Sequence, residues 1–170
     1  MDCGVWNGGS TLLLASGAPS RDIWAFDSFA GLPEPTEVDP DYAREWVGKV
    51  VGSEQLLRQG FRDYGLENPL HVIKGWFEET LPAHGGNIES IAVLHVDADW
   101  YESVDLVLRI LYPKLSPGGW VAVDDYRTWR GTTLAVDEYR REMGIKAPIL
   151  GHHCWQKPLE GAEVPLSVGA

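Results

Sequence analysis

Four short apolar runs recur along the 170-residue chain, and longer segments with helical spacing separate them. The runs cover residues 23–26, 70–73, 91–96 and 120–123. Helical spacing is clearest in two stretches, residues 103–111 and 134–143. Strands that alternate with helices predict βαβ units and a mostly parallel sheet. Because the strands are almost entirely apolar, we expect helices on both faces of that sheet, in one α/β domain over residues 1–170.

The net charge and composition argue against several classes of binding partner. The net charge is -11, so the chain offers no cationic surface for nucleic acid, and an anionic membrane would repel it. Cys3 and Cys154 match no zinc spacing and are expected to be reduced thiols of a cytoplasmic protein. The sequence contains no signal-peptide pattern and no apolar stretch of the ~20 residues that a membrane helix needs.

The segment 34–64 is long for a connection between a strand and a helix, since most are ~4–6 residues. It contains several charges and two prolines. Residues 35–60 could form a lid over a site, and a solvent-covering surface excursion is the equal alternative. Nearer the end of the chain, residues 148–150 and 152–156 could form a final hairpin.

A glycine-rich segment opens the chain and has the form acidic-x-G-x-x-x-G-G. Glycines allow backbone to approach a ligand closely between a strand and a helix N-terminus. The candidate contacts are Asp2, Gly4, Val5, Trp6 and Gly8. By itself the segment could also be only a turn.

A second candidate site begins at Asp27, which ends the first apolar run ~20 residues after the glycines, where dinucleotide-binding folds place a ribose-binding carboxylate. Ser28 and Phe29 follow it, although Asp-Ser is also good turn chemistry. Gly75, Trp76 and Phe77 follow the second run, and this aromatic pair could line an adenine ring or belong to the core. His152 and His153 lie far from these segments and are expected to be structural or solvent-facing.

Four aspartates follow the last two apolar runs: Asp97, Asp99, Asp124 and Asp125. Carboxylates so close together repel one another, and a hard divalent cation would relieve that repulsion. If the two strands are neighbours, the four side chains converge at one edge of the sheet and suit octahedral magnesium. The alternative is that Asp99 or Asp125 merely caps the helix that follows.

Together these segments resemble the macrocin-O-methyltransferase (TylF-type) family of class I methyltransferases that use S-adenosylmethionine. The matching stretches are GVWNGGS, AFDSFAGLP, KGWFEETLP, HVDADWYES and LYPKLSPGGWVAVDDY, in family order. The resemblance implies a Rossmann-like fold and a magnesium-dependent O-methylation. The implied acceptor is a small molecule, a sugar hydroxyl on a natural product such as a macrolide or aminocoumarin.

The resemblance also implies roles for particular residues. Asp97, Asp124 and Asp125 would hold magnesium, and Asp99 would be the general base that takes the proton of the acceptor hydroxyl. Asp2, Gly4, Val5, Trp6 and Gly8 would surround S-adenosylmethionine, together with the segments that begin at Asp27 and Gly75. A hydroxyl is a poor acid and needs help to lose its proton. A cation that stabilises the developing alkoxide and a carboxylate within hydrogen-bond reach are together sufficient for that step.

One departure from the family pattern concerns the first strand, because the chain starts at the acidic residue of the glycine-rich motif. We expect the family's first strand and N-terminal extension to be missing, which would leave unpaired edges inside the sheet. Neighbouring strands, a partner chain or self-association could close such a gap.

Three other functions remain open at this stage. The chain could be a truncated, inactive methyltransferase-like fragment. It could be an aspartate-nucleophile phosphatase, for which Lys114 and Ser116 are loosely eligible. It could also be a sugar-nucleotide transferase with a D-x-D metal site.

Overall fold

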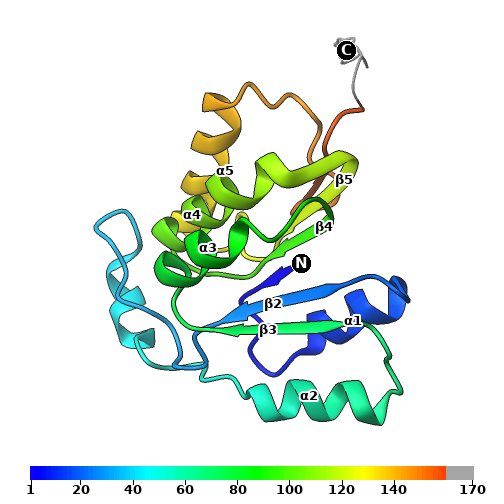
Figure 1. Cartoon of the computed structure of the whole chain (residues 1–170). Coiled ribbons are helices and arrows are strands. Elements are labelled where there is room, and N and C mark those ends of the chain that lie inside the picture. The colour runs from blue at the N-terminus through cyan, green and yellow to red at the C-terminus, as the bar shows by residue number, and fades with distance from the viewer. Residues whose placement is uncertain (160–170) are drawn as a thin grey trace.

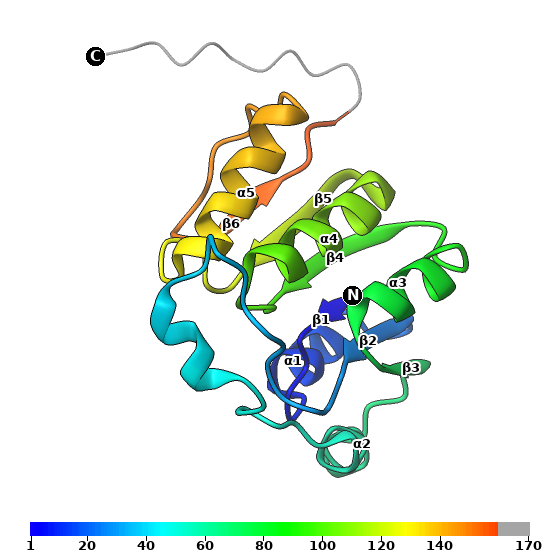
Figure 2. The same cartoon turned by 90° about the vertical axis from the view of Figure 1, so that its left-hand side faces the viewer.

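The computed structural model describes residues 1–159, and the last part of the expected domain, 160–170, lies outside the described residues. Among these residues, six strands form one sheet in the order β3-β2-β1-β4-β5-β6 (Figures 1 and 2). Their bounds are β1 Asp2–Cys3, β2 Ile23–Asp27, β3 Leu70–Lys74, β4 Ile91–Val96, β5 Leu115–Val123 and β6 Cys154–Gln156. The first five are parallel and β6 is antiparallel to β5, so the predicted mostly parallel α/β sheet is confirmed.

Helices cover both faces of this sheet, as Figures 1 and 2 show. The helices are α1 Gly9–Gly17, α2 Glu54–Asp63, α3 Phe77–Gly85, α4 Tyr101–Leu111 and α5 Arg130–Glu142, with 3-10 turns η1 Asp41–Trp46 and η2 Tyr112–Lys114. Apolar residues of α1 and α2 pack with β2 and β3 into one core cluster. Those of α3, α4 and α5 form the larger cluster with β4 and β5 on the other face. No helix among residues 1–159 is both long and apolar enough to span a membrane.

The structure corrects the expectation of a missing first strand. Asp2 and Cys3 themselves form β1, pairing with Ala25 and Phe26 of β2 on one side and with His95 and Val96 of β4 on the other. Both residues are fully buried. A two-residue strand that begins with a carboxylate gives no hydrophobic signature, so only the pairing partners on both sides reveal it.

Two further boundaries differ from the sequence expectation. β5 begins at Leu115 rather than at residue 120, and its ladder with β4 contains a register shift between Ile91 and Val93. The Pro and Gly residues at 117–119 are typical of a turn, yet a bulge accommodates them in the strand. The expected hairpin is reduced to one bridge between Leu150 and Cys154, because β6 pairs mainly with β5.

The strand order places a topological switch point at β1. From β1 the chain runs outward to β2 and β3, and it then crosses to β4 and β5 on the other side of β1. Ligands of open α/β sheets bind beyond the carboxyl ends of the strands at such a point. The segments after β1, β2, β4 and β5 therefore border the expected site.

Candidate active site

The glycine-rich turn after β1 packs directly on the backbone that follows β4. Gly4 has φ +86°, donates its N–H to the Phe26 carbonyl at 2.9 Å, and lies so close to the Asp97 carbonyl oxygen that a Cβ would overlap it. Gly8 has φ +95° and forms the N-cap of α1. Positive φ values and the missing side chains explain why glycine is required at both positions.

Asp27 connects the end of β2 to this turn. Its Oδ2 accepts the backbone N–H groups of Val5 and Trp6 at 2.7 and 2.8 Å, and its Oδ1 accepts that of Phe29 at 2.6 Å. An ionised carboxylate has about four lone-pair positions, so one remains for a ligand hydroxyl. Asp27 therefore organises the backbone around the turn and keeps some capacity to bind a ribose.

A cleft opens beside Asp27, at the carboxyl ends of the strands where ligands of open α/β sheets bind. Seven of the predicted cofactor-binding residues line it: Gly4, Trp6, Asp27, Ser28, Gly75, Trp76 and Phe77. Asp97 and Asp99 line it as well, so the nucleoside-type residues and the carboxylates share one cavity. Val5, Gly8 and Phe29 are not part of the lining.

Asp2 is also absent from the lining, because its side chain is fully buried beneath the turn. Its carboxylate accepts hydrogen bonds from Ser10 Oγ at 2.8 Å and from Thr11 Oγ1, and it pairs with His95 Nδ1 at 2.8 Å. Burial lowers the pKa of His95, but the bond to Asp2 and nearby carboxylates outweigh it and raise the pKa overall. Through these bonds Asp2 connects β1 to α1 and β4, and it stabilises the turn that lies over it.

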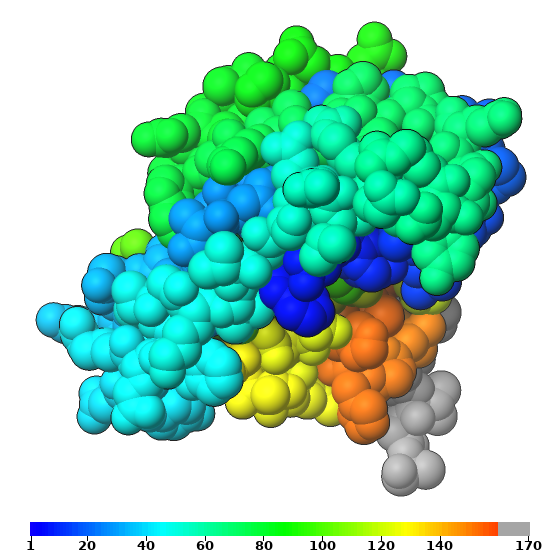
Figure 3. Space-filling view, turned by 90° about the horizontal axis from the view of Figure 1, so that it is seen from below, coloured from blue at the N-terminus to red at the C-terminus, as the bar shows by residue number. Residues whose placement is uncertain are grey.

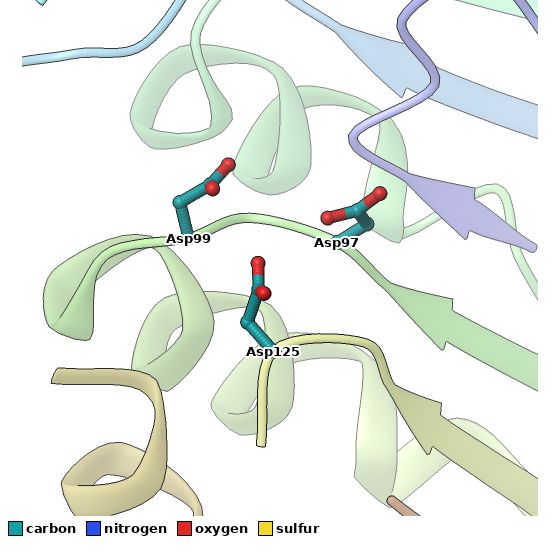
Figure 4. Close-up of side chains that lie close together, drawn as sticks. All are labelled: Asp97, Asp99 and Asp125. Carbon is teal, nitrogen blue, oxygen red and sulfur yellow. The ribbon is translucent and has the colours of Figure 1, made fainter. Parts of the chain in front are cut away.

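Three aspartates converge at the carboxyl ends of β4 and β5 (Figure 4). Asp97, Asp99 and Asp125 each place a carboxylate oxygen within 4.8 Å of the others. The strand ends are aligned by pairing, since the Asp124 N–H donates to the Val96 carbonyl at 2.9 Å. The prediction that these strands are neighbours and bring their carboxylates together is confirmed for this trio.

The surroundings make these carboxylates hard to ionise. Burial raises the pKa of Asp97 to about 7, with added repulsion from Asp124 and Asp125. Burial and repulsion from Asp125 raise the pKa of Asp99 to about 7. Burial and Asp124 raise the pKa of Asp125 to about 6, against hydrogen bonds from Asp99 and Trp129 that lower it. Partly buried oxygen ligands that repel one another fit a hard divalent cation, which would relieve the repulsion.

The positions of Asp124 and Asp99 differ from those predicted from the sequence. Asp124 is exposed and lies outside the trio, although its charge still raises the pKa of Asp97. Asp99, assigned as the base, lies inside the trio where a ligand was expected. The assignment of Asp97, Asp124 and Asp125 to the metal and of Asp99 to proton transfer stays a prediction.

The connection from β2 to α2 adds residues that sequence reasoning missed. Gly31, Leu32, Pro33 and Val50 line the cleft, as do Glu78, Ala98 and Ser103 from other elements. The length of the 34–64 segment allowed a lid and a surface excursion equally, and of these residues only Val50 lies within it. Nothing in the sequence identified which residues of the connection reach the cleft, because those positions carry no charge or special spacing.

The two residues considered for a phosphatase lie at the wrong end of β5. Lys114 precedes the strand and donates to the Ile88 carbonyl at 2.9 Å, and Ser116 is its second residue. Strands rise roughly 3.3 Å per residue, so neither reaches Asp125 beyond the opposite end. His152 is exposed and His153 half-buried in the turn before β6, and the His153 carbonyl accepts the Val123 N–H at 3.0 Å, at the carboxyl end of β5. Neither histidine is among the residues that line the cleft.

The raised pKa values predict a pH-dependent stability of the metal-free protein. Asp99 has a pKa of about 7 in the folded chain, against 3.8 ordinarily. Between these pH values the native state binds more protons than the unfolded state, so the free energy of unfolding falls as pH rises through this window. Asp99→Asn removes that loss. We expect Tm measured in EDTA to match wild type near pH 4.5 and to exceed it by about 2–4 °C at pH 7.5. A Tm difference that stays constant with pH would contradict the burial of this charge.

Comparison with known proteins adds to this geometry. The family model of macrocin-O-methyltransferase (TylF) matches residues 1–154. The chain belongs to the macrocin-O-methyltransferase (TylF) family. Sequence and structure thus agree on the family that the motifs resemble.

Two named O-methyltransferases are similar to the chain. It is 38% identical over 161 residues to demethyldecarbamoylnovobiocin O-methyltransferase of Streptomyces niveus, covering 88% of this chain and 61% of that protein. It is 37% identical over 160 residues to 8-demethyl-8-(2,3-dimethoxy-alpha-L-rhamnosyl)-tetracenomycin-C 4'-O-methyltransferase of Streptomyces olivaceus, covering 88% and 60%. The chain therefore spans less than two thirds of the length of these relatives.

A solved structure agrees with the fold. The O-methyltransferase NovP superposes with a TM-score of 0.80 at 34% identity, over 92% of this chain and 70% of NovP. The calicheamicin methyltransferase CalS11 superposes with a TM-score of 0.73 at 22% identity, over 92% of this chain and 70% of CalS11, which supports the fold. The sheet is therefore that of a class I, Rossmann-like methyltransferase.

Proposed function

We propose that the chain transfers a methyl group from S-adenosylmethionine to a sugar hydroxyl of a natural product, with the help of a divalent cation. The observation that carries this proposal is the shared cavity. Asp97 and Asp99 line the same cleft as Asp27 and Gly4, so a bound nucleoside and a carboxylate-bound acceptor would meet there. The names of the two relatives support the acceptor class, since they are O-methyltransferases of a novobiocin compound and of a rhamnosyl-tetracenomycin.

The residues around the cleft fit S-adenosylmethionine. Gly4 lets the turn lie against the backbone after β4 at the floor of the cleft, and Asp27 keeps one acceptor position for a ribose hydroxyl. Trp76 lines the cleft and is 37% exposed, as an aromatic wall requires. The carboxylate-rich rim suits the positive charge of a sulfonium. We assign Val5 and Phe29 to the same site through their N–H bonds to Asp27, and Gly8 through the turn it ends.

When bound, S-adenosylmethionine would supply the electrophilic methyl group, and a magnesium ion would stabilise negative charge on the acceptor oxygen. Asp97, Asp125 and Asp124 are the residues that we assign to holding the ion. We assign Asp99 to accepting the proton of the acceptor hydroxyl at a carboxylate oxygen, since it lines the cleft beside Asp97. Positioning is the other contribution of the chain, since the cleft orients the two reactants toward one another.

The proposal is tested first by binding and then by turnover. S-adenosylhomocysteine is titrated calorimetrically into the purified chain, with and without magnesium. Next, methyl transfer from S-adenosylmethionine to desmethyl glycosides is followed by mass spectrometry. Saturable binding at one site and magnesium-stimulated transfer are expected. A folded chain that binds no S-adenosylhomocysteine would contradict the proposal, and transfer that is unaffected by EDTA would contradict the metal.

Asp27→Ala is expected to weaken S-adenosylhomocysteine binding by about 10- to 100-fold, because it removes a charged hydrogen-bonding group from the turn and the ribose. The matched control is Asp22→Ala, which removes an exposed aspartate at the opposite end of β2 that pairs only with His71 at 3.3 Å. Equal affinity of the two variants, measured by the same titration, would refute the role of Asp27.

A further inference from the structure

A buried carboxylate joins the connection between β2 and α2 to the start of α4. Asp39 is 4% exposed, and its Oδ1 accepts the backbone N–H of Tyr101, the first residue of α4, at 3.0 Å. Its Oδ2 accepts the N–H and hydroxyl of Thr36 at 2.8 and 2.9 Å. Negative charge at a helix N-terminus is stabilised by the free N–H groups and the helix dipole.

The same carboxylate also lies against the start of α5. A Cβ at Gly131, the second residue of α5, would overlap Asp39 Oδ1, so glycine at this position allows the approach. Nearby, the rings of Tyr42 and Trp129 are 5.6 Å apart. Figure 3 shows the cyan part of this connection lying against the yellow segment after β5. Asp39 is therefore enclosed between two helix N-termini and its own turn.

These two helix N-termini border Asp99. The residue has φ +57°, a left-handed conformation that a non-glycine residue adopts only when its neighbours hold it. Thr132, beside Gly131, is fully buried and donates its hydroxyl to the Asp99 carbonyl. On the other side, the Trp100 indole donates to the Pro33 carbonyl at 2.9 Å. The segment from Asp99 to Tyr101 is thus fixed at three consecutive residues.

We propose that Asp39 is a positioning residue, which holds the Asp99–Tyr101 segment so that the Asp99 carboxylate points toward Asp97 and Asp125. The role rests on the proposed function of Asp99 in proton transfer. It also gives the connection before α2 a role besides lining the cleft, because that connection carries Asp39 to the two helix N-termini. A methyl transfer that depends on alignment loses rate when the base shifts by even ~1 Å. Asp39 bonds to Thr36 and Tyr101, whereas the residues assigned to the cofactor, Gly4 and Asp27, lie on other segments.

The test compares Asp39→Ala with wild type by steady-state kinetics and by amide hydrogen exchange. We expect kcat to fall about 10- to 100-fold while KM for S-adenosylmethionine stays within about twofold. Exchange of the amides of residues 99–103 is expected to become faster. Asp39→Asn keeps an acceptor oxygen without the charge and should recover part of the loss, and it serves as the test should the alanine variant fail to fold. Thr132→Val, which removes the bond to Asp99, is expected to reproduce the fall in kcat.

The matched control is Asn68→Ala, which removes two buried hydrogen bonds, to the carbonyls of Ala18 and Arg21, at the far end of the sheet. It should lower Tm without changing kcat or the exchange of residues 99–103. If the Asp39 variants only lower Tm, with kcat and exchange as in the control, the positioning role is wrong. A wild-type chain that transfers no methyl group would overturn the proposed function instead, and the exchange data would still decide whether Asp39 orders the segment.

Discussion

Replacing Asp99 by asparagine is expected to lower kcat for methyl transfer by about 10²- to 10⁴-fold, the usual contribution of a general base. Asparagine has the same shape and tolerates the left-handed φ of +57°, so the backbone should keep its course. The amide cannot accept the proton of the acceptor hydroxyl. S-adenosylhomocysteine affinity should remain unchanged, because the ribose and turn contacts are made by other residues.

Kinetics as a function of magnesium concentration distinguish the two roles open to Asp99. Loss of a general base lowers kcat at every magnesium concentration, and it leaves unchanged the magnesium concentration that gives the half-maximal rate. A lost ligand instead raises the half-maximal concentration, which is the result expected for Asp97→Asn and Asp124→Asn. The Asp22→Asn variant is the control for a general change in charge. Full activity of Asp99→Asn would eliminate Asp99 as the base.

Replacing Gly4 by alanine is expected to abolish cofactor binding and to destabilise the fold by about 2–4 kcal/mol. The new Cβ would overlap the Asp97 carbonyl oxygen, and φ +86° is unfavourable for alanine. Both effects push the turn away from the loop after β4. Thermal unfolding gives the stability change, and titration with S-adenosylhomocysteine gives the affinity.

Gly9→Ala, five residues further along the chain, is the matched control. Nothing lies within 4 Å of a Cβ at Gly9, which is the first residue of α1 and has no positive φ. We expect its Tm and its affinity for S-adenosylhomocysteine to equal those of wild type. If Gly4→Ala behaved like Gly9→Ala, the close approach of the turn to Asp97 would not be needed for binding.

Much of the sheet could be predicted from the sequence because apolar runs that end in aspartate are local signals. Residues 91–96 form β4 with the predicted bounds, and Asp27 and Asp97 lie at the carboxyl ends of their strands. Helix α3 was missed because Pro82 lies inside it, and proline usually ends a helix. The tertiary contacts of α3 with α4 and the core override that local preference.

The sequence by itself determined the α/β class, the family and the carboxylates at the strand ends, because hydrophobic periodicity and motif spacing are properties of neighbouring residues. Tertiary structure alone decided that Asp2 and Cys3 pair as a central strand, that Asp99 rather than Asp124 joins the trio, and that Asp39 reaches Tyr101. Each of these depends on contacts between residues far apart in the chain, which pair only after the strands and helices have packed.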